Sequence, residues 1–201
     1  MFVQVIQGKV KDAAGVRATL DRWQTDLAAG APGWLGTTSG VTDDGDFVAL
    51  ARFASEEEAR ANSDRPEQGE WWTELVSHFD GEPTVHDSTY VEVDTHGDPG
   101  TAGFVQVMQG RTSDLERSRE LMTGNPVDWA SYRPDILATV NVGHDEGDWT
   151  MAIYFTSEAA AREGEATPPT PEMAAMMEEL QKLSVGEPTF YDLRDPWLVG
   201  P

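Results

Sequence analysis

The chain has 201 residues, and its 36 Asp and Glu against 14 Lys and Arg give a formal net charge of -22 at pH 7. This charge argues against nucleic acid and anionic membrane surfaces as partners, because phosphates bind clustered Lys and Arg, whereas acidic residues here occur in every segment. The sequence has no cysteine, no apolar run near the ~18 residues of a membrane helix and no leader-like start, so we expect a soluble cytoplasmic protein.

The chain is an internal duplication. Residues 2–60 align on residues 104–162 without a gap, at a constant offset of 102. The match is strongest where Phe-Val-Gln-Val-Ile-Gln-Gly at the start of the first copy meets Phe-Val-Gln-Val-Met-Gln-Gly in the second. The expected division is a first unit over 1–93, a linker over 94–103 and a second unit over 104–201.

The first copy predicts the order strand, helix, strand, strand, helix, strand. Its first helix follows from the spacing of Val16, Leu20 and Trp23 on one face, and a capping box of Ser55 and Glu58 starts a later helix. An acidic turn between two strand-like runs predicts an antiparallel hairpin. The expected strands are 2–10, 34–41, 47–53 and 83–93, and the expected helices are 12–29, a short one from 55, and 68–79.

The second copy departs from the first in its helices. Asn125-Pro126 falls where the first copy has Trp23-Gln24, so Pro126 is expected to end the helix and Asn125 to cap a short turn that runs through Trp129. The later helix is expected over 171–183, with methionines at the positions of Trp71 and Trp72.

This order is the split βαβ arrangement, an antiparallel sheet with helices on one face. A second sheet can cover the other face, so the fold class predicted is α+β: two ferredoxin-like repeats whose sheets pack face to face as an intramolecular pseudo-dimeric α+β barrel. The first-strand and hairpin patterns, the repeat length and the element order resemble the dimeric α+β barrel superfamily, most closely its antibiotic-biosynthesis-monooxygenase-like branch. A monomeric pseudo-dimer is expected, with further self-association left open.

Glutamines occupy the interior of both first strands. Gln4 and Gln7 recur as Gln106 and Gln109, and a buried amide without a partner costs about 1–3 kcal/mol. One interpretation is that they bond one another or neighbouring strands. The other is that Gln7 and Gln109 point toward the helices and orient a ligand.

His78 is the sharpest difference between the copies. With the last strands aligned at an offset of 105, it stands opposite Leu183 and shares a helical face with Trp71 and Leu75. A histidine there is a candidate general base or a candidate axial ligand of haem. A neighbouring apolar stripe through Trp72 would instead turn it toward solvent, so a structural role stays open.

Tryptophans on the helices, Trp23 and Trp71 or Trp72, are candidate walls of a cleft for a planar ligand. The resemblance also bears on haem, because a first-strand amide, a Trp and a His enclose haem in the haem-degrading branch, and Gln7, Trp71 or Trp72 and His78 are similar in type. The first-strand residue is Gln rather than Asn, however, and the second copy has neither Trp nor His at these positions.

No metal site is predicted, because no spacing of His and carboxylates matches a metal motif and the acidic hairpin lacks the pattern of a calcium loop.

Three hypotheses about function follow from the sequence. The first is a cofactor-independent monooxygenase that binds a small aromatic or polyketide-like substrate, with His78 as its base. The second is a non-catalytic or stress-associated barrel that binds a small hydrophobic molecule. The third is a haem-binding or haem-degrading enzyme. The first copy is the better candidate for a single working cleft.

Overall fold

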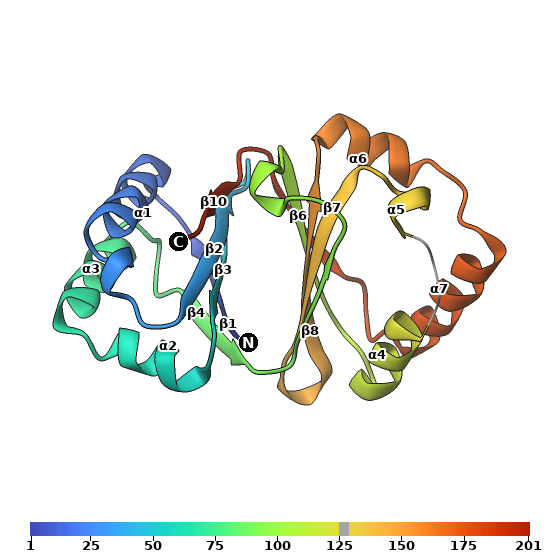
Figure 1. The fold of residues 1–201 in the computed structure, drawn as a ribbon, viewed down its shortest axis with the longest axis horizontal. Helices are drawn as coiled ribbons and strands as arrows, with labels where there is room; N and C mark the ends of the chain where they lie inside the picture. Colours follow the sequence, from blue (N-terminus) through green and yellow to red (C-terminus); the bar gives the residue numbers. More distant parts are fainter. Residues whose placement is uncertain (125–128) are drawn as a thin grey trace. The chain divides into compact units, whose positions relative to one another are not determined.

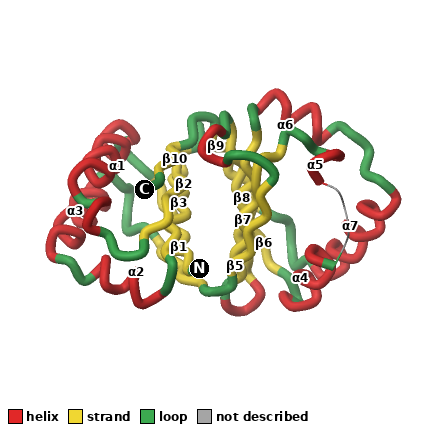
Figure 2. Tube along the Cα trace, viewed as in Figure 1, coloured by secondary structure: helices red, strands yellow, loops and turns green. Residues whose placement is uncertain are grey.

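The computed structural model describes residues 1–124 and 129–201 and divides into two compact units. Unit 1 comprises Met1–Val91 with Asp195–Pro201, and unit 2 comprises Glu92–Arg194. Each contains a five-stranded sheet, with helices on one face of it (Figures 1 and 2). The α+β class and the tandem of ferredoxin-like repeats are therefore confirmed, and the packing of the two sheets against each other stays a prediction.

Unit 1 has the sheet order β10-β2-β3-β1-β4, and its pairs are antiparallel. The expected hairpin is confirmed by the pairing of β2 with β3. The elements are β1 (Phe2–Lys9), α1 (Ala13–Asp26), β2 (Trp34–Val41), β3 (Asp46–Phe53), α2 (Glu56–Ser63), α3 (Pro66–Ser77), β4 (Thr84–Ser88) and β10 (Trp197–Val199), with a 3-10 turn at Ala28–Gly30.

Unit 2 has the equivalent order β5-β7-β8-β6-β9. Its elements are β5 (Val91–Thr95), β6 (Phe104–Arg111), α4 (Leu115–Thr123), α5 (Trp129–Tyr132), β7 (Ile136–Gly143), β8 (Asp148–Phe155), α6 (Glu158–Glu165), α7 (Pro171–Leu183) and β9 (Thr189–Leu193), with 3-10 turns at Pro99–Thr101 and Asp145–Gly147. Helix α4 ends earlier than its counterpart α1, as expected, but Asn125 and Pro126 lie outside the described residues.

The two copies exchange their last strands, which the sequence did not predict. The expected strand over 83–93 is divided, because β4 pairs with β1 in unit 1 whereas β5 joins the edge of β7 in unit 2. Reciprocally, β10 pairs with β2 in unit 1. A β-strand pattern shows which residues are extended, but it does not show which edge they join. Part of the expected linker, 94–103, is therefore strand β5.

Local chemistry sets the starts of the helices. The Asp12 carboxylate accepts from the Gly15 amide at 2.9 Å and caps α1, and the Ser55 hydroxyl accepts from the Glu58 amide at 3.2 Å, which confirms the capping box. In β2 a bulge between Trp34 and Gly36 re-aims the strand, and Gly36 has a φ of 131°, which a side chain would disfavour.

Two aromatic clusters lie between the sheet and the helices of unit 1. Phe2 and Phe53 pack with Trp23, Trp34 and Ala59. The second cluster joins the buried residues Val16, Phe47, Ala49, Leu75 and Phe79. None of the helices formed by residues 1–124 and 129–201 is long and apolar enough to cross a membrane.

Candidate functional site

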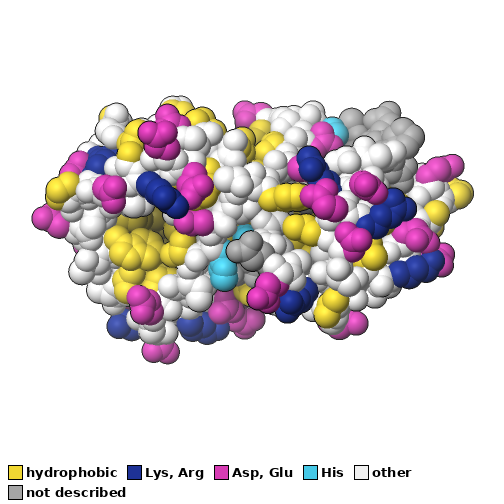
Figure 3. Space-filling model, turned by 90° about the horizontal axis from the view of Figure 1, so that it is seen from below, with side chains coloured by type: hydrophobic (Ala, Val, Ile, Leu, Met, Phe, Trp, Pro, Cys, Tyr) yellow, Lys and Arg dark blue, Asp and Glu magenta, His cyan; other side chains and the backbone are white. Residues whose placement is uncertain are grey.

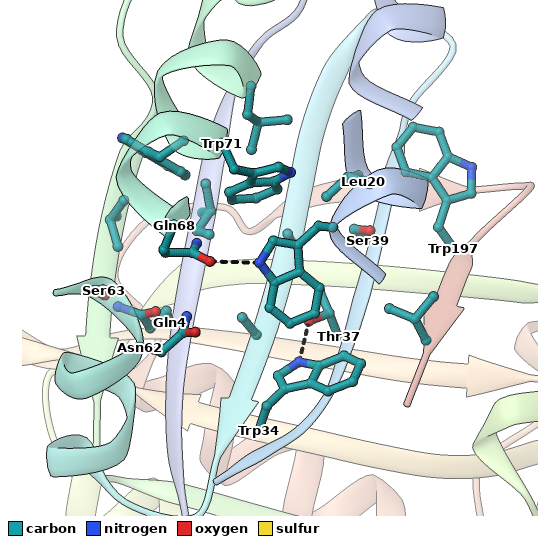
Figure 4. A pocket seen from close by; sticks show the side chains of 18 of the residues that line it. Gln4, Leu20, Trp34, Thr37, Ser39, Asn62, Ser63, Gln68, Trp71 and Trp197 are labelled. Atoms are coloured by element: carbon teal, nitrogen blue, oxygen red, sulfur yellow. Dashed lines mark hydrogen bonds between the residues drawn. The ribbon is translucent and has the colours of Figure 1, made fainter. Parts of the chain in front are cut away.

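A cavity of about 280 Å³ lies in unit 1, between the sheet and helices α1 to α3 (Figure 4). The molecular surface shows a hollow with hydrophobic side chains on this unit, surrounded by charged ones (Figure 3). This volume is near the lower end of the roughly 300–1,000 Å³ of small-molecule sites. The cavity is lined by Gln4, Ile6, Leu20, Asp21, Trp23, Trp34, Thr37, Ser39, Phe47, Ala49, Ala51, Phe53, Asn62, Ser63, Gln68, Gly69, Trp71, Trp72, Leu75, Val85, Trp197 and Val199.

Indole rings dominate the wall. Five of the seven tryptophans of the chain line the cavity: Trp23, Trp34, Trp71, Trp72 and Trp197. Trp23 makes an edge contact with Trp34 at a centroid distance of 4.9 Å and a tilted contact with Trp71 at 6.2 Å. Flat rings at several angles provide both faces and edges for a planar aromatic molecule.

Three of these rings are fixed by hydrogen bonds within the protein. The Trp23 indole N–H donates to the side-chain oxygen of Gln68 at 2.7 Å, that of Trp34 to the Thr37 hydroxyl at 3.0 Å, and that of Trp71 to the Thr19 carbonyl at 2.8 Å. Trp197 is held differently, because the Arg17 guanidinium lies 5.0 Å from its ring centroid. Four of the five rings therefore have an orienting contact within the protein.

Amides supply the polar part of the wall. Gln4 of β1 donates to the Asp87 carboxylate at 3.0 Å, and the Asn62 oxygen accepts from Arg65 at 2.9 Å. Figure 4 shows Gln4, Asn62 and Gln68 on the same side of the cavity, across from Trp34. Among the lining residues, all of which the structure describes, Asp21 is the only ionisable side chain.

The structure brings part of the predicted site together. Trp23, Trp71 and Trp72 all line the cavity, whereas Gln7 does not. The predicted orientation of Gln7 toward the helices is wrong, because strand residues alternate and Gln4 has the helix-facing position. The Gln4–Asp87 bond recurs as Gln106 to Asp192 at 2.9 Å, which supports the interpretation that these amides bond neighbouring strands.

His78 lies outside the cavity lining, at the C-terminal end of α3. Its Nδ1 is 3.2 Å from the Asp12 carboxylate, and its Nε2 is 3.3 Å from the Thr19 hydroxyl. The ring also packs against Gly15, where a Cβ atom would collide with it. A chain of contacts from Asp12 through His78 to a hydroxyl resembles an activated nucleophile. The hydroxyl belongs to Thr19, however, which is only 1% exposed and cannot reach a substrate. The contacts instead join the end of α3 to the start of α1.

Gln109 lies in unit 2, away from the cavity. Its amide donates to the Thr150 hydroxyl at 3.0 Å, and His144 Nε2 is 3.0 Å from the same hydroxyl. The predicted role of Gln109 in ligand binding therefore has no support from a described cavity, and its bond to Thr150 of β8 is a contact between neighbouring strands.

Sequence reasoning missed Gln4, Trp34, Asn62, Gln68 and Trp197 as parts of the wall. Alternation along β1 could have identified Gln4, because Phe2 and Ile6 share its face. Trp197 gave no such signal, since its position in unit 1 depends on the strand exchange.

In unit 2, guanidinium groups lie over the phenylalanines that correspond to Phe2 and Phe53. The Arg162 guanidinium lies 5.2 Å from the Phe104 ring centroid and bonds Asp192, whereas its counterpart Arg60 has a 76% exposed side chain. Arg133 lies 5.6 Å from the Phe155 ring. A hydrogen bond from Arg133 to Asp135 raises the pKa of Arg133, so this cation stays charged.

The haem hypothesis requires an axial ligand in the cavity, usually His, Cys, Met or Tyr. The lining set contains none of these side chains. His78, the candidate for this role, contacts Asp12 and Thr19 instead. The residues present therefore do not fit haem in this cavity.

No protein-family model matches the chain, and no curated protein matches it. Several solved structures match the chain in fold. A candidate monooxygenase from Lactobacillus acidophilus superposes with a TM-score of 0.74 at 12% identity, over 98% of both chains. An anthrone oxidase-like protein superposes with a TM-score of 0.70 at 11% identity, over 100% of this chain and 94% of that one.

A haem-degrading enzyme from Listeria monocytogenes is a more distant match, with a TM-score of 0.50 at 11% identity over 95% of this chain and 98% of that one. The chain thus shares its fold with these structures over nearly its full length. Identities this low show the fold, and the chemistry has to be argued from the site.

Proposed function

We propose that the protein is a cofactor-independent monooxygenase that binds a small, electron-rich aromatic ketone in the cavity of unit 1. The observation that carries the proposal is the wall of five indole rings around about 280 Å³. Such a wall favours a flat, neutral molecule of two or three fused rings. The full-length likeness to an anthrone oxidase-like protein supports anthrone as the first substrate to test. The absence of cysteine is compatible with action in the cytoplasm.

The proposed reaction converts a CH₂ group flanked by aryl rings into a carbonyl. Loss of one proton gives an enolate, which transfers electrons to O₂. One oxygen atom then forms the new C=O bond, and the other leaves as water with the two hydrogens. The substrate is oxidised and O₂ is reduced, so no further reductant is needed. The protein provides an aromatic cavity that holds the substrate and N–H donors that stabilise the enolate oxygen.

Asp21 is the proposed proton acceptor, because it is the only ionisable side chain of the lining. It lies on α1 at the edge of the cavity and forms an ion pair with Arg17 at 3.0 Å. This assignment replaces His78, which the structure holds between α1 and α3.

Oxygen uptake with anthrone tests the proposal. We expect the protein to consume one O₂ per anthraquinone formed, and Asp21→Asn to lower turnover about 100-fold or more, as loss of a general base does. Asp26→Asn is the matched control, because Asp26 ends the same helix but does not line the cavity. Uptake no faster than the uncatalysed rate would reject the enzymatic function.

A second function is favoured by a specific observation. The indole N–H groups of Trp23, Trp34 and Trp71 are all bonded inside the protein, so they hold the wall rather than the ligand. A non-catalytic carrier of a small aromatic molecule would need only such a wall. Binding of anthrone without oxygen uptake would establish this alternative.

A further inference from the structure

Asn62 and Gln68 each have one half of the amide fixed by the protein and the other half exposed to the cavity. The orientation of each amide follows from its partner. Arg65 and the Trp23 indole are pure donors, so Asn62 Oδ1 and Gln68 Oε1 must face them, at 2.9 and 2.7 Å. Both NH₂ groups are thereby directed away from these partners.

The two NH₂ groups have no hydrogen-bond partner among the residues that the structure describes. This matters most for Asn62, which is only 4% exposed yet lines the cavity. The Asn62 NH₂ group is not among the fully buried unpartnered atoms, so it is reachable from the cavity, and a ligand oxygen that accepts from it gains a hydrogen bond of about 0.5–1.5 kcal/mol. The Arg65 cation also polarises the Asn62 amide, which strengthens its N–H groups as donors.

The second copy has neither donor. At the offset of 102, Gly164 stands in place of Asn62, and at the offset of 105, Met173 stands in place of Gln68. Arg133 lies against Gly164, where a Cβ atom would collide with its guanidinium. The donors thus occur in the copy that has the aromatic cavity. The duplicated Gln4–Asp87 pair, in contrast, is common to both copies.

We propose that Asn62 and Gln68 are specificity-determining donors for a ketone or enolate oxygen of the ligand. The site then selects aryl ketones over hydrocarbons of the same shape. Gln4 complements them, because its NH₂ group faces Asp87 and its carbonyl oxygen is the acceptor left for a ligand hydroxyl. This inference rests on the proposed binding of an aromatic molecule in the cavity.

Equilibrium dialysis with fluorene and 9-fluorenone tests the inference, since the two differ by one carbonyl oxygen. We expect the ketone to bind about threefold to tenfold more tightly per donor engaged. Asn62→Asp and Gln68→Glu keep the oxygen that Arg65 or Trp23 requires but replace the donor with an acceptor, so each should abolish much of this preference. Gln24→Glu, which makes the same change of amide to carboxylate at an exposed residue of α1 outside the cavity lining, should leave it intact.

The outcomes separate the two proposals. If both compounds bind equally to the unaltered protein, or if the preference survives in Asn62→Asp and Gln68→Glu, the donor role is rejected while the aromatic site stands. If neither compound binds, the proposed ligand class is wrong and the donor role fails with it. Thermal unfolding of each variant confirms that the loss of preference does not come from unfolding.

Discussion

His78 shows how a chemically versatile side chain can have a structural role. Both ring nitrogens are engaged, one with Asp12 at the start of α1 and one with Thr19, whose carbonyl also accepts from Trp71. The histidine therefore contributes to the position of an indole of the cavity wall through one intermediate residue. It does not line the cavity itself.

Replacement of His78 tests this role. His78→Ala should lower the free energy of unfolding by about 1–2 kcal/mol, because two polar contacts are lost. Turnover and ligand affinity should stay within about twofold, measured below the unfolding transition. A loss of turnover of 100-fold with unchanged stability in urea would instead make His78 the base.

Two glycines within helices show where the low helix propensity of glycine decides stability and where packing overrides it. Gly15 and Gly69 both lie within helices, α1 and α3, where Gly costs roughly 0.5–1 kcal/mol relative to Ala. A Cβ atom at Gly69 would meet no atom within 4 Å, whereas at Gly15 it would collide with Asp12 and the His78 ring.

The two alanine variants should therefore differ in sign. Gly69→Ala should raise the free energy of unfolding by about 0.5–1 kcal/mol. Gly15→Ala should lower it by about 1 kcal/mol, because His78 must leave its two partners. Urea denaturation followed by tryptophan fluorescence measures both, since most tryptophans lie in unit 1. Equal stabilisation by both substitutions would contradict the packing seen at Gly15.

For the whole molecule, the duplication has kept one fold and produced two different interiors. Unit 1 encloses a cavity walled by indoles, whereas unit 2 places Arg133 and Arg162 over the corresponding phenylalanines. Burial alone lowers the pKa of Arg162, but Asp192 and Glu165 raise it, and the net effect is an increase. A permanent cation there disfavours an apolar ligand. Such a ligand would remove water from the guanidinium without giving it a hydrogen bond in return.

The chain should consequently bind one aromatic ligand. Titration of anthrone or 9-fluorenone by dialysis is expected to saturate at one molecule per chain, and Trp72→Ala should weaken that binding. Arg162→Leu, in unit 2, should leave the affinity of the first site unchanged. Saturation at two molecules per chain would show that unit 2 also has a working site.

The sequence predicts the repeat, the order of elements and three of the wall tryptophans, because these follow from periodicity and from direct comparison of the copies. Gln7 was misplaced by a choice between two strand faces that alternation alone leaves open. Asn62 gave no signal, since a polar residue on a short helix is ordinary until the structure shows it 4% exposed. Trp197 required knowledge of which sheet edge β10 joins.

The position of Trp197 has a consequence for the order in which the protein is made. Domains generally fold as they emerge from the ribosome, N-terminal part first. Unit 1 begins the chain, but one of its edge strands and one indole of its cavity come from residues translated after all of unit 2. During synthesis the cavity of unit 1 therefore stays incomplete, and the edge of β2 stays unpaired, until the second copy has emerged from the ribosome.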